Sequence, residues 1–441
     1  MVTAHRQASF LGLSLKAMIT IPPRAHTAMW SAFVRNSIQQ ARIAALNLTR
    51  HRRRTLLALA IICGGVVSFL LAGGFINWVL WGMREGVIQS QLGHVQITRP
   101  GYFRDGASDP YRFLLDGDLS VIRGGPTFEI RTVAPRLAFT GLVSINDATI
   151  SFIGEGVDAQ AEIPLSGGIT TLAGSDLASA GADAAVLGEG LAANLGAHPG
   201  DSVVLMATTA SGGVNAVELK VAGIFATPVK AYDDTAIRVP IEAARRLMRV
   251  DGATSWVVLL DDTAHTDAAI ASFRAALPAD RYEIVPWIEL ADFYNKTVEL
   301  FGTQVNAVLL LIAVIVVLSI SNTLSMAVIE RTTEIGTSMA LGVRRLGILG
   351  LFVWEGVVLG VVAGVLGVGI ALALGELISF VGIPMPPPPG MSRGYTGRID
   401  ISAALALQGF LLAFLATVVA SILPAWKASR MNIVDALRHH A

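Results

Sequence analysis

The chain has 441 residues, with 33 acidic and 33 basic residues, and 53% of its residues are hydrophobic. A mean hydropathy of +0.59 with only 15% charged residues lies outside the usual range for soluble domains and indicates a membrane protein. The net charge of zero excludes nucleic acid as a partner, because no broad basic field is available to neutralise phosphates. The single cysteine, Cys63, excludes an intramolecular disulfide.

The N-terminal region precedes the first long apolar run. Residues 1–29 carry no clear pattern and are interpreted as a cytoplasmic tail without regular structure. Residues 30–54 alternate apolar and polar side chains in a way that predicts an amphipathic helix on the inner membrane surface, with an ordinary cytosolic helix as the alternative. No small-residue cleavage site follows the first apolar run, so a cleaved signal peptide is not expected.

Four later stretches are long and apolar enough to cross a bilayer, which requires about 20 residues. The expected transmembrane helices are residues 55–82, 303–329, 346–380 and 401–424. They are separated by a large domain at 83–302, a charged link at 330–345 and a short loop at 381–400, and they are followed by a tail at 425–441.

Basic residues near the ends of these stretches predict their orientation, since cytoplasmic loops are enriched in lysine and arginine. The basic clusters are Arg50–Arg54 before the first span, Arg331, Arg344 and Arg345 in the link, and Lys427, Arg430 and Arg438 in the tail. We therefore expect a multi-pass membrane protein with both termini cytoplasmic. The large domain and the short loop then lie on the opposite side of the membrane.

The large domain has the pattern of an α+β fold. Alternating segments such as "GHVQITRPGY" predict strands, and "AAVLGEGLAANLGAHPGDSVVLMA" (Ala184–Ala207) predicts a short helix ended by a glycine and followed by a strand. "TDAAIASFRAAL" predicts an amphipathic helix with Thr266 as its N-cap. The fold class is thus four transmembrane helices with a large α+β extracytoplasmic domain between the first two.

Several kinds of catalytic motif are absent from this sequence. None of its five lysines follows a glycine, which excludes a G-x-x-x-x-G-K-[ST] phosphate loop. It also contains no H-E-x-x-H, C-x-x-C or G-x-S-x-G. We therefore predict no catalytic, cofactor-binding or metal-binding residues and no enzymatic activity in this chain.

The charged link is unusual between two apolar helices. Within it, Ile335, Met339 and Leu341 form an apolar cluster, and Gly342 is a predicted C-cap. A short exposed amphipathic helix of this kind suits docking into a groove on a partner protein. A structural turn between the two spans is the alternative.

A stripe of small residues follows on the third predicted span. Gly356, Gly360 and Gly364 recur every four residues on one helix face, which lets another helix approach closely. Packing within the chain and a seam between two copies both explain this spacing.

These motifs together resemble the MacB/FtsX/LolCE superfamily of ABC-transporter permeases, also called type VII. The family link E-R-x-x-E-I-G-x-x-x-A-L-G is matched from Glu330 to Gly342, and "PAWKASRMNIVDALR" resembles the family's C-terminal ending, with Ile433 where proline is usual and Asp435 where glutamate is usual. "VLGEGLAANLGAHPGDSVVL" resembles its periplasmic core domain. The resemblance extends from about Ala41 to Arg438.

The resemblance implies a four-span subunit of the bacterial inner membrane, with its large domain in the periplasm, that works as a homodimer or heterodimer. Each copy would bind a separate ABC ATPase, which would hold ATP and magnesium, while this chain binds no cofactor. The residues implied to couple to the ATPase are Glu330, Arg331, Glu334, Ile335, Gly336, Met339, Ala340, Leu341 and Gly342. ATP hydrolysis would then move the periplasmic domain by mechanotransmission.

Three functions are compatible with that resemblance. The length, "GHVQITRPGY" and the proline-rich outer loop are most like the LolC/LolE branch, which predicts release of lipoproteins or lipids from the membrane, with a periplasmic carrier as a further partner. The first alternative is efflux of a peptide, antibiotic or other amphiphile with a periplasmic adaptor. The second is FtsX-like signalling to a cell-wall hydrolase without transport.

Overall fold

The computed structural model describes residues 39–50, 52–106, 109–116, 119–227, 229–385 and 395–432. The predicted tail at 1–29, residues 30–38 of the predicted surface helix, residues 386–394 of the short loop and the end of the C-terminal tail from 433 lie outside them. The chain divides into two compact units. The helical unit comprises Met1–Gly74, Gln304–Leu377 and Ile399–Ala441, and the globular unit comprises Phe75–Thr303 and Ile378–Arg398.

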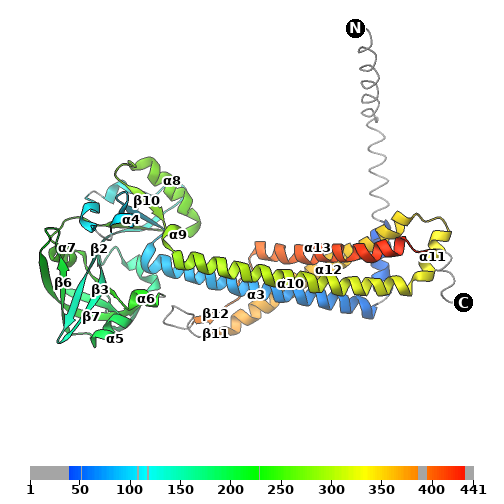
Figure 1. The fold of residues 1–441 in the computed structure, drawn as a ribbon, viewed down its shortest axis with the longest axis horizontal. Coiled ribbons are helices and arrows are strands. Elements are labelled where there is room, and N and C mark those ends of the chain that lie inside the picture. Colours follow the sequence, from blue (N-terminus) through cyan, green and yellow to red (C-terminus); the bar gives the residue numbers. More distant parts are fainter. Residues whose placement is uncertain are drawn as a thin grey trace, which may run out of the picture. The chain divides into compact units, whose positions relative to one another are not determined.

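Four helices of the described chain are long and apolar enough to cross a membrane. They are α3 (Arg52–Val87), α10 (Asp292–Glu330), α12 (Arg345–Val381) and α13 (Ala403–Ser429), coloured from blue to red in Figure 1. α3 and α10 each run without a break from one unit into the other. The four-helix architecture expected from the sequence is confirmed.

The core of the helical unit draws on all four helices. It includes Ile62 and Phe69 of α3, Ile320 of α10, Ala363 of α12 and Ala413 of α13. On the opposite side of α10, Leu310 and Leu318 are 63% and 65% exposed, respectively. Apolar side chains on both faces of a helix are typical of a helix that is surrounded partly by protein and partly by lipid.

The ends of the helices differ from the predicted boundaries. A helix covers residues 39–50, and α3 begins at Arg52, so the arginines at 52–54 belong to α3 rather than to the preceding helix. α11 (Thr332–Ala340) lies between α10 and α12. α13 continues through Pro424 to Ser429, because Ala425 and Ala428 are buried against α11 and α12.

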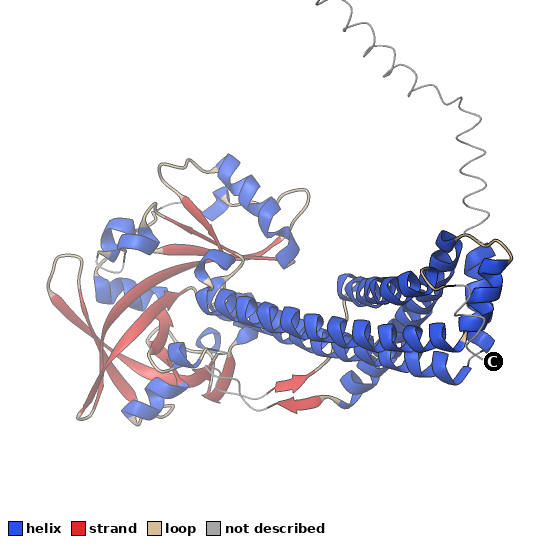
Figure 2. Cartoon of the chain, turned by 45° about the vertical axis from the view of Figure 1, so that its right-hand side comes forward, coloured by secondary structure: helices blue, strands red, loops and turns tan. Residues whose placement is uncertain are grey.

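The globular unit is built on a mixed sheet of ten strands (Figure 2). In chain order the strands are β1 (Val95–Thr98), β2 (Ile130–Ile145), β3 (Ala148–Val157), β4 (Thr170–Gly174), β5 (Ala184–Gly188), β6 (Ser202–Thr208), β7 (Val214–Ala226), β8 (Ala236–Pro240), β9 (Ser255–Leu260) and β10 (Glu283–Pro286). Nine of them follow the spatial order β10-β1-β9-β2-β3-β8-β5-β7-β4, and β6 pairs with β2 and β7. A separate pair joins β11 (Ile383–Met385) to β12 (Tyr395–Gly397).

Six of these strands pair in a closed ring. β2 pairs with β3, β3 with β8, β8 with β5, β5 with β7, β7 with β6, and β6 again with β2. β3–β8 and β5–β7 are parallel, and the other four pairs are antiparallel. Closure leaves few unpaired edges in this part of the sheet. Its fully buried side chains include Val143, Leu187, Leu205 and Ile237.

Short helices and helical turns connect the strands. The helices are α4 (Tyr102–Asp105), α5 (Glu189–Leu195), α6 (Lys230–Asp233), α7 (Ile241–Met248), α8 (Thr266–Ala276) and α9 (Trp287–Leu290). A π-helical turn, η1 (Ile88–Leu92), follows α3, and the 3-10 turns are η2 (Pro110–Phe113), η3 (Leu119–Val121), η4 (Ile163–Gly168), η5 (Leu177–Ser179) and η6 (Thr263–His265). As predicted, α5 ends at a glycine, Gly196, which has a φ of 67°.

The predicted N-cap of α8 is wrong. Thr266 is already helical, and its hydroxyl donates to the carbonyl oxygen of Thr263. The residue with a capping side chain is Asp262, which accepts from the backbone N–H of Ala264 and so begins η6. The 3-10 turn that precedes α8 displaces the cap towards the N-terminus.

Candidate functional site

α11 lies between α10 and α12 and turns one face inward. Ile335 and Met339 on this face are 5% and 8% exposed, respectively, and belong to a cluster with Val328 of α10, Phe352 of α12 and Ala428 of α13. Gly336 is buried beside them. The prediction of an exposed apolar cluster is therefore wrong for Ile335 and Met339, because the ends of three neighbouring helices cover them.

The C-terminal end of the link is exposed. Leu341 and Leu346 are 83% and 78% exposed, respectively, and the intervening Arg344 and Arg345 are also exposed. Gly342 has a φ of 92°, and its N–H donates to the carbonyl oxygen of Met339 over 3.0 Å, which ends α11. We call residues 340–346 the tip. It presents three large apolar side chains, those of Leu341, Val343 and Leu346, and two cations to the surroundings.

Ion pairs hold the base of α11. Arg331 Nη1 lies 2.8 Å from Glu355 Oε1, and the same oxygen accepts a 2.8 Å hydrogen bond from Asn47 Nδ2. The Arg331 and Glu355 side chains are only 13% and 4% exposed, respectively. The pair thus connects helix 39–50, the α10–α11 junction and α12 within the helical unit. Breaking a buried pair of this kind is much more costly than breaking an exposed one.

Two exposed pairs lie near this junction. Arg54 Nη1 is 2.6 Å from Glu330 Oε2, and Arg50 Nη1 is 3.7 Å from Glu334 Oε1. Glu330 and Glu334 are more than half exposed, so each pair contributes little to stability. The predicted coupling residues are thereby divided between a buried support and an exposed surface.

The glycine stripe of α12 lies against α13. A Cβ atom added at Gly356 would stand 2.7 Å from Ser421 Cβ, one at Gly360 would stand 2.2 Å from Thr417 Oγ1, and one at Gly364 would stand 2.8 Å from Phe410 Cδ2. All three glycines are buried in this contact. Any larger side chain would separate the two helices, so the stripe is occupied by packing within the chain.

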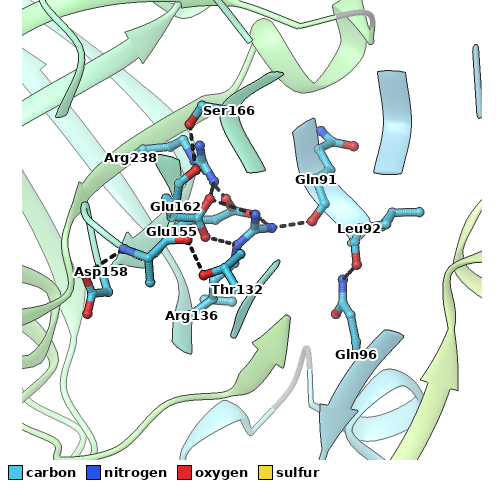
Figure 3. Close-up of polar contacts among 12 residues, drawn as sticks. Gln91, Leu92, Gln96, Thr132, Arg136, Glu155, Asp158, Glu162, Ser166 and Arg238 are labelled. Carbon is cyan, nitrogen blue, oxygen red and sulfur yellow. Dashed lines mark hydrogen bonds and ion pairs between the residues drawn. The ribbon is translucent and has the colours of Figure 1, made fainter. Parts of the chain in front are cut away.

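The globular unit contains a buried charge network that links three strands and a turn (Figure 3). Arg136 of β2 donates from Nε to Glu162 Oε1 over 2.7 Å and from Nη2 to Oε2 over 3.0 Å. Arg238 of β8 donates from Nη2 to Glu162 Oε2 over 2.8 Å and from Nε to Glu155 Oε2 of β3 over 3.2 Å. Each buried arginine of the network is thus paired with at least one glutamate, as buried charges require.

The protonation states of the network follow from this pairing. Burial alone would raise the pKa of Glu162, but the adjacent Arg136 and Arg238 outweigh it and hold the pKa at about 2. Burial opposes the charge of Arg238, yet Glu162 and Glu155 keep its pKa above the ordinary value. Glu162 and the two arginines are therefore charged at neutral pH. No nucleophile or free base stands among them, so the network is suited to structural support.

The network also reaches the end of α3. Arg136 Nη1 donates to the backbone carbonyl oxygen of Gln91 in η1. A Cβ atom added at Gly168 of η4 would stand 2.6 Å from the carbonyl oxygen of Gly86 in α3, so these two segments touch. Both contacts lie within the globular unit, and they join its charged core to the helix that continues into the helical unit.

A cavity of about 310 Å³ lies beside this network, and the sequence did not predict it. Arg238 and Glu162 line it, together with apolar side chains that include Val157, Leu177 and Phe225. The signal in the sequence was the presence of charged residues, such as Arg136 and Arg238, inside otherwise apolar strands. Among the described residues no group of three or more His, Cys, Asp or Glu is placed to hold a metal ion.

Comparison with known families gives two matches that together cover most of the chain. Residues 55–276 match the MacB-like periplasmic core domain, and residues 306–433 match the FtsX-like permease C-terminal region. The first match contains most of the globular unit, including the charge network. The second contains α11, the tip and the glycine stripe.

Two individual relatives agree with these matches. The macrolide export ATP-binding/permease protein MacB of Bordetella avium is 25% identical over 92% of this chain and 61% of that protein. The protein of the same name from Psychrobacter arcticus is 30% identical over 42% of this chain and 26% of that protein. This chain thus spans 61% or less of the length of these relatives. The crystal structure of the periplasmic region of MacB from Actinobacillus actinomycetemcomitans is 15% identical, with a TM-score of 0.34, over 48% of this chain and 95% of that one.

Proposed function

Because the chain belongs to the MacB/FtsX superfamily of permeases, we propose that it is the membrane subunit of an ABC transporter and that a separate ATPase subunit binds at the tip. The exposed Leu341 and Leu346 beside Arg344 and Arg345 carry this proposal, because apolar anchors among charges are typical of a protein interface. ATP and magnesium would be held by that partner. The tip and both termini would then face the cytoplasm of the bacterial cell, and the globular unit the periplasm.

The packing of α11 suggests how a force at the tip would spread. Ile335 and Met339 contact residues of α10, α12 and α13, and Arg331 is tied to Glu355 of α12. A close-packed cluster is rigid, so α11 cannot shift without moving these helix ends. α10 and α3 continue into the globular unit, which makes them the route by which ATP binding would move that unit.

The cargo in this proposal is an amphiphile that is handled from the periplasmic side of the inner membrane. The relatives named for macrolide export favour efflux with a periplasmic adaptor. Release of lipoproteins or lipids with a periplasmic carrier is the second candidate, which the resemblance to the LolC/LolE branch supports. The large globular unit argues against the FtsX-like signalling alternative, since FtsX-type outer domains are usually much shorter.

A first experiment identifies the partner and the cargo. The tagged full chain is purified in mild detergent, and bound proteins and lipids are identified by mass spectrometry. An ABC ATPase with a periplasmic adaptor supports efflux, and an ABC ATPase with acylated lipoproteins supports lipoprotein release. A purification without any ABC ATPase contradicts the proposal.

A second experiment tests the tip. Leu341→Asp and Leu346→Asp should each abolish co-purification of that ATPase while the protein still inserts into the membrane. Leu46→Asp is the matched control, because Leu46 is also exposed, at 61%, but belongs to helix 39–50 and not to the tip. Equal recovery of the ATPase with all three variants would remove the tip from the interface.

A further inference from the structure

The cavity in the globular unit has the composition of a ligand site. It is bounded by η4, η5 and strands β4, β5 and β7, and its apolar lining includes Val157, Leu177, Val186 and Phe225, each less than a tenth exposed. Its volume of about 310 Å³ falls within the usual range for small-molecule pockets. At roughly 30 Å³ for each water-sized group, it has room for about ten non-hydrogen atoms.

The polar part of the lining has spare hydrogen-bond donors. Arg238 is 4% exposed and uses Nε and Nη2 for Glu155 and Glu162. Its Nη1 group donates to no acceptor within the described parts of the chain, although an arginine carries five N–H donors. The carboxylate of Glu162, by contrast, already accepts from both arginines. Because Arg238 lines the cavity, this donor is available to a ligand that brings an acceptor.

The charge balance decides which acceptor fits. Arg136 and Arg238 are matched by Glu155 and Glu162, so no buried positive charge is left over for an anion. The carboxylate of Asp176 also stands at the rim, where it accepts from the N–H of Ser179. A ligand carboxylate would therefore be buried without a counter-charge, which is strongly unfavourable. An uncharged carbonyl or ether oxygen carries no such cost.

We propose that this cavity binds a small uncharged amphiphile, with its apolar part against Val157, Leu177 and Phe225 and an oxygen acceptor towards Arg238. The proposal does not depend on the function proposed above. Ile163, Ser166 and Gly167 of η4 form one wall, and the next residue, Gly168, touches Gly86 of α3. A bound molecule would thus press on the turn that contacts the end of α3.

The test is photo-crosslinking of the full chain in nanodiscs. Three probes share a diazirine-bearing chain of about four carbons, which with its head group comes to about ten non-hydrogen atoms or fewer, and carry an N,N-dimethylamide, a carboxylate or an amine. Peptide mapping should find adducts of the dimethylamide at residues 157–178 and 223–225, with about tenfold less from the charged probes. Equal labelling of these peptides by all three probes would overturn the selection for an uncharged head.

Two variants on β4 locate the binding site. Thr171 lines the cavity, whereas the preceding Thr170 does not, and successive strand residues face opposite sides. Both are exposed, so Thr171→Trp fills the space with little effect on folding, and Thr170→Trp is its matched control. The dimethylamide adducts should be lost in Thr171→Trp and kept in Thr170→Trp. Adducts that persist in Thr171→Trp, or that occur only in α3, α10, α12 and α13, would refute the cavity as a binding site.

A final arm separates two sources of such a ligand. In nanodiscs that contain a diazirine-bearing phosphatidylcholine and no free probe, adducts at residues 157–178 would show that a lipid chain enters the cavity. Their absence, with labelling by the free dimethylamide, would assign the site to a free small molecule. Absence of cavity adducts in both arms overturns the proposal.

Discussion

Each unit of the molecule buries a glutamate, and the two are satisfied differently. Glu162 in the globular unit uses both carboxylate oxygens, with three hydrogen bonds from two arginines. Glu355 in the helical unit receives Asn47 and Arg331 on the same oxygen, Oε1. Its Oε2 has no hydrogen-bond donor in the parts of the chain that the structure describes.

The Glu162 network and the Glu355 pair are therefore expected to differ in rigidity. A saturated network allows no exchange of partners without leaving a buried charge unpaired, so the Glu162 network fixes β2, β8 and η4 in one arrangement. Glu355 of α12 has a spare oxygen and faces Arg331 at the α10–α11 junction, so this pair can exchange partners without leaving its charge unpaired. We therefore expect the globular network to act as a fixed support and the helical one as a pair that can rearrange.

The largest stability effect should follow from neutralising Glu162. Glu162→Gln preserves the shape of the side chain but leaves Arg136 and Arg238 with Glu155 as the remaining carboxylate of the network. Loss of one partner from a buried ion pair costs about 3–5 kcal/mol. Chemical unfolding followed by tryptophan fluorescence measures the loss, and the exposed Glu129→Gln is the control, with an expected change below about 0.5 kcal/mol. Equal stability of both variants would refute a supporting role for the network.

In the unaltered protein, the contribution of the same network should be measurable as a loss of stability at low pH. The pKa of Glu162 is lowered from 4.5 to about 2 in the folded state, so its stabilisation is complete above pH 4.5 and is lost as the pH falls towards 2. A shift of this size corresponds to about 3 kcal/mol. Glu162→Gln should lack this part of the acid dependence. Parallel curves of unfolding free energy against pH for the two proteins would contradict the assignment.

Glu355→Gln should have a smaller effect. It removes the charge that Arg331 faces, but Arg331 is 13% exposed and the amide oxygen still accepts. A hydrogen bond to a charged group contributes about 1.5–3 kcal/mol, so we expect a loss of about 2 kcal/mol. The same unfolding assay measures it. A loss as large as that of Glu162→Gln would show that the two glutamates are equally fixed.

The smallest effect on stability is expected at the tip. Leu341→Asp should change the unfolding free energy by less than about 0.5 kcal/mol, because an 83% exposed side chain loses little packing. Ile335→Asp, six residues earlier on the buried face, should instead destabilise the helical unit by several kcal/mol, since it buries an unpaired charge. If Leu341→Asp also unfolds the helical unit, its loss of ATPase binding says nothing about an interface.

Much of the fold could be predicted from the sequence, because apolar runs and strand alternation are local signals. The four long helices and the helix that ends at Gly196 are of this kind. The link at 330–345 was also recognisable as helical. Its pattern defined an apolar face with Ile335 and Met339, but periodicity does not reveal whether the same chain or a partner covers that face.

The charge network could not be predicted, because its members are far apart in the sequence. Arg136 and Glu162 are 26 residues apart, and Arg238 is another 76 residues beyond Glu162. They meet only when β8 pairs in parallel with β3, which in turn pairs with β2. Non-local pairing of this kind follows from topology rather than from any local pattern. The glycine stripe had a clear local pattern, but its partner, α13, became evident only in the structure.

In the proposed function, ATP binding in the partner moves the globular unit through α3 and α10. The most direct test is the distance between spin labels at Val214, which is 77% exposed in the globular unit, and Leu46 in the helical unit, measured by pulsed electron paramagnetic resonance. The chain's one cysteine, Cys63, is first replaced by alanine. In the complex with its ATPase, the distance distribution should shift when a non-hydrolysable ATP analogue binds, and the shift should be absent without the ATPase. An unchanged distribution in a complex that hydrolyses ATP would contradict this movement of the globular unit.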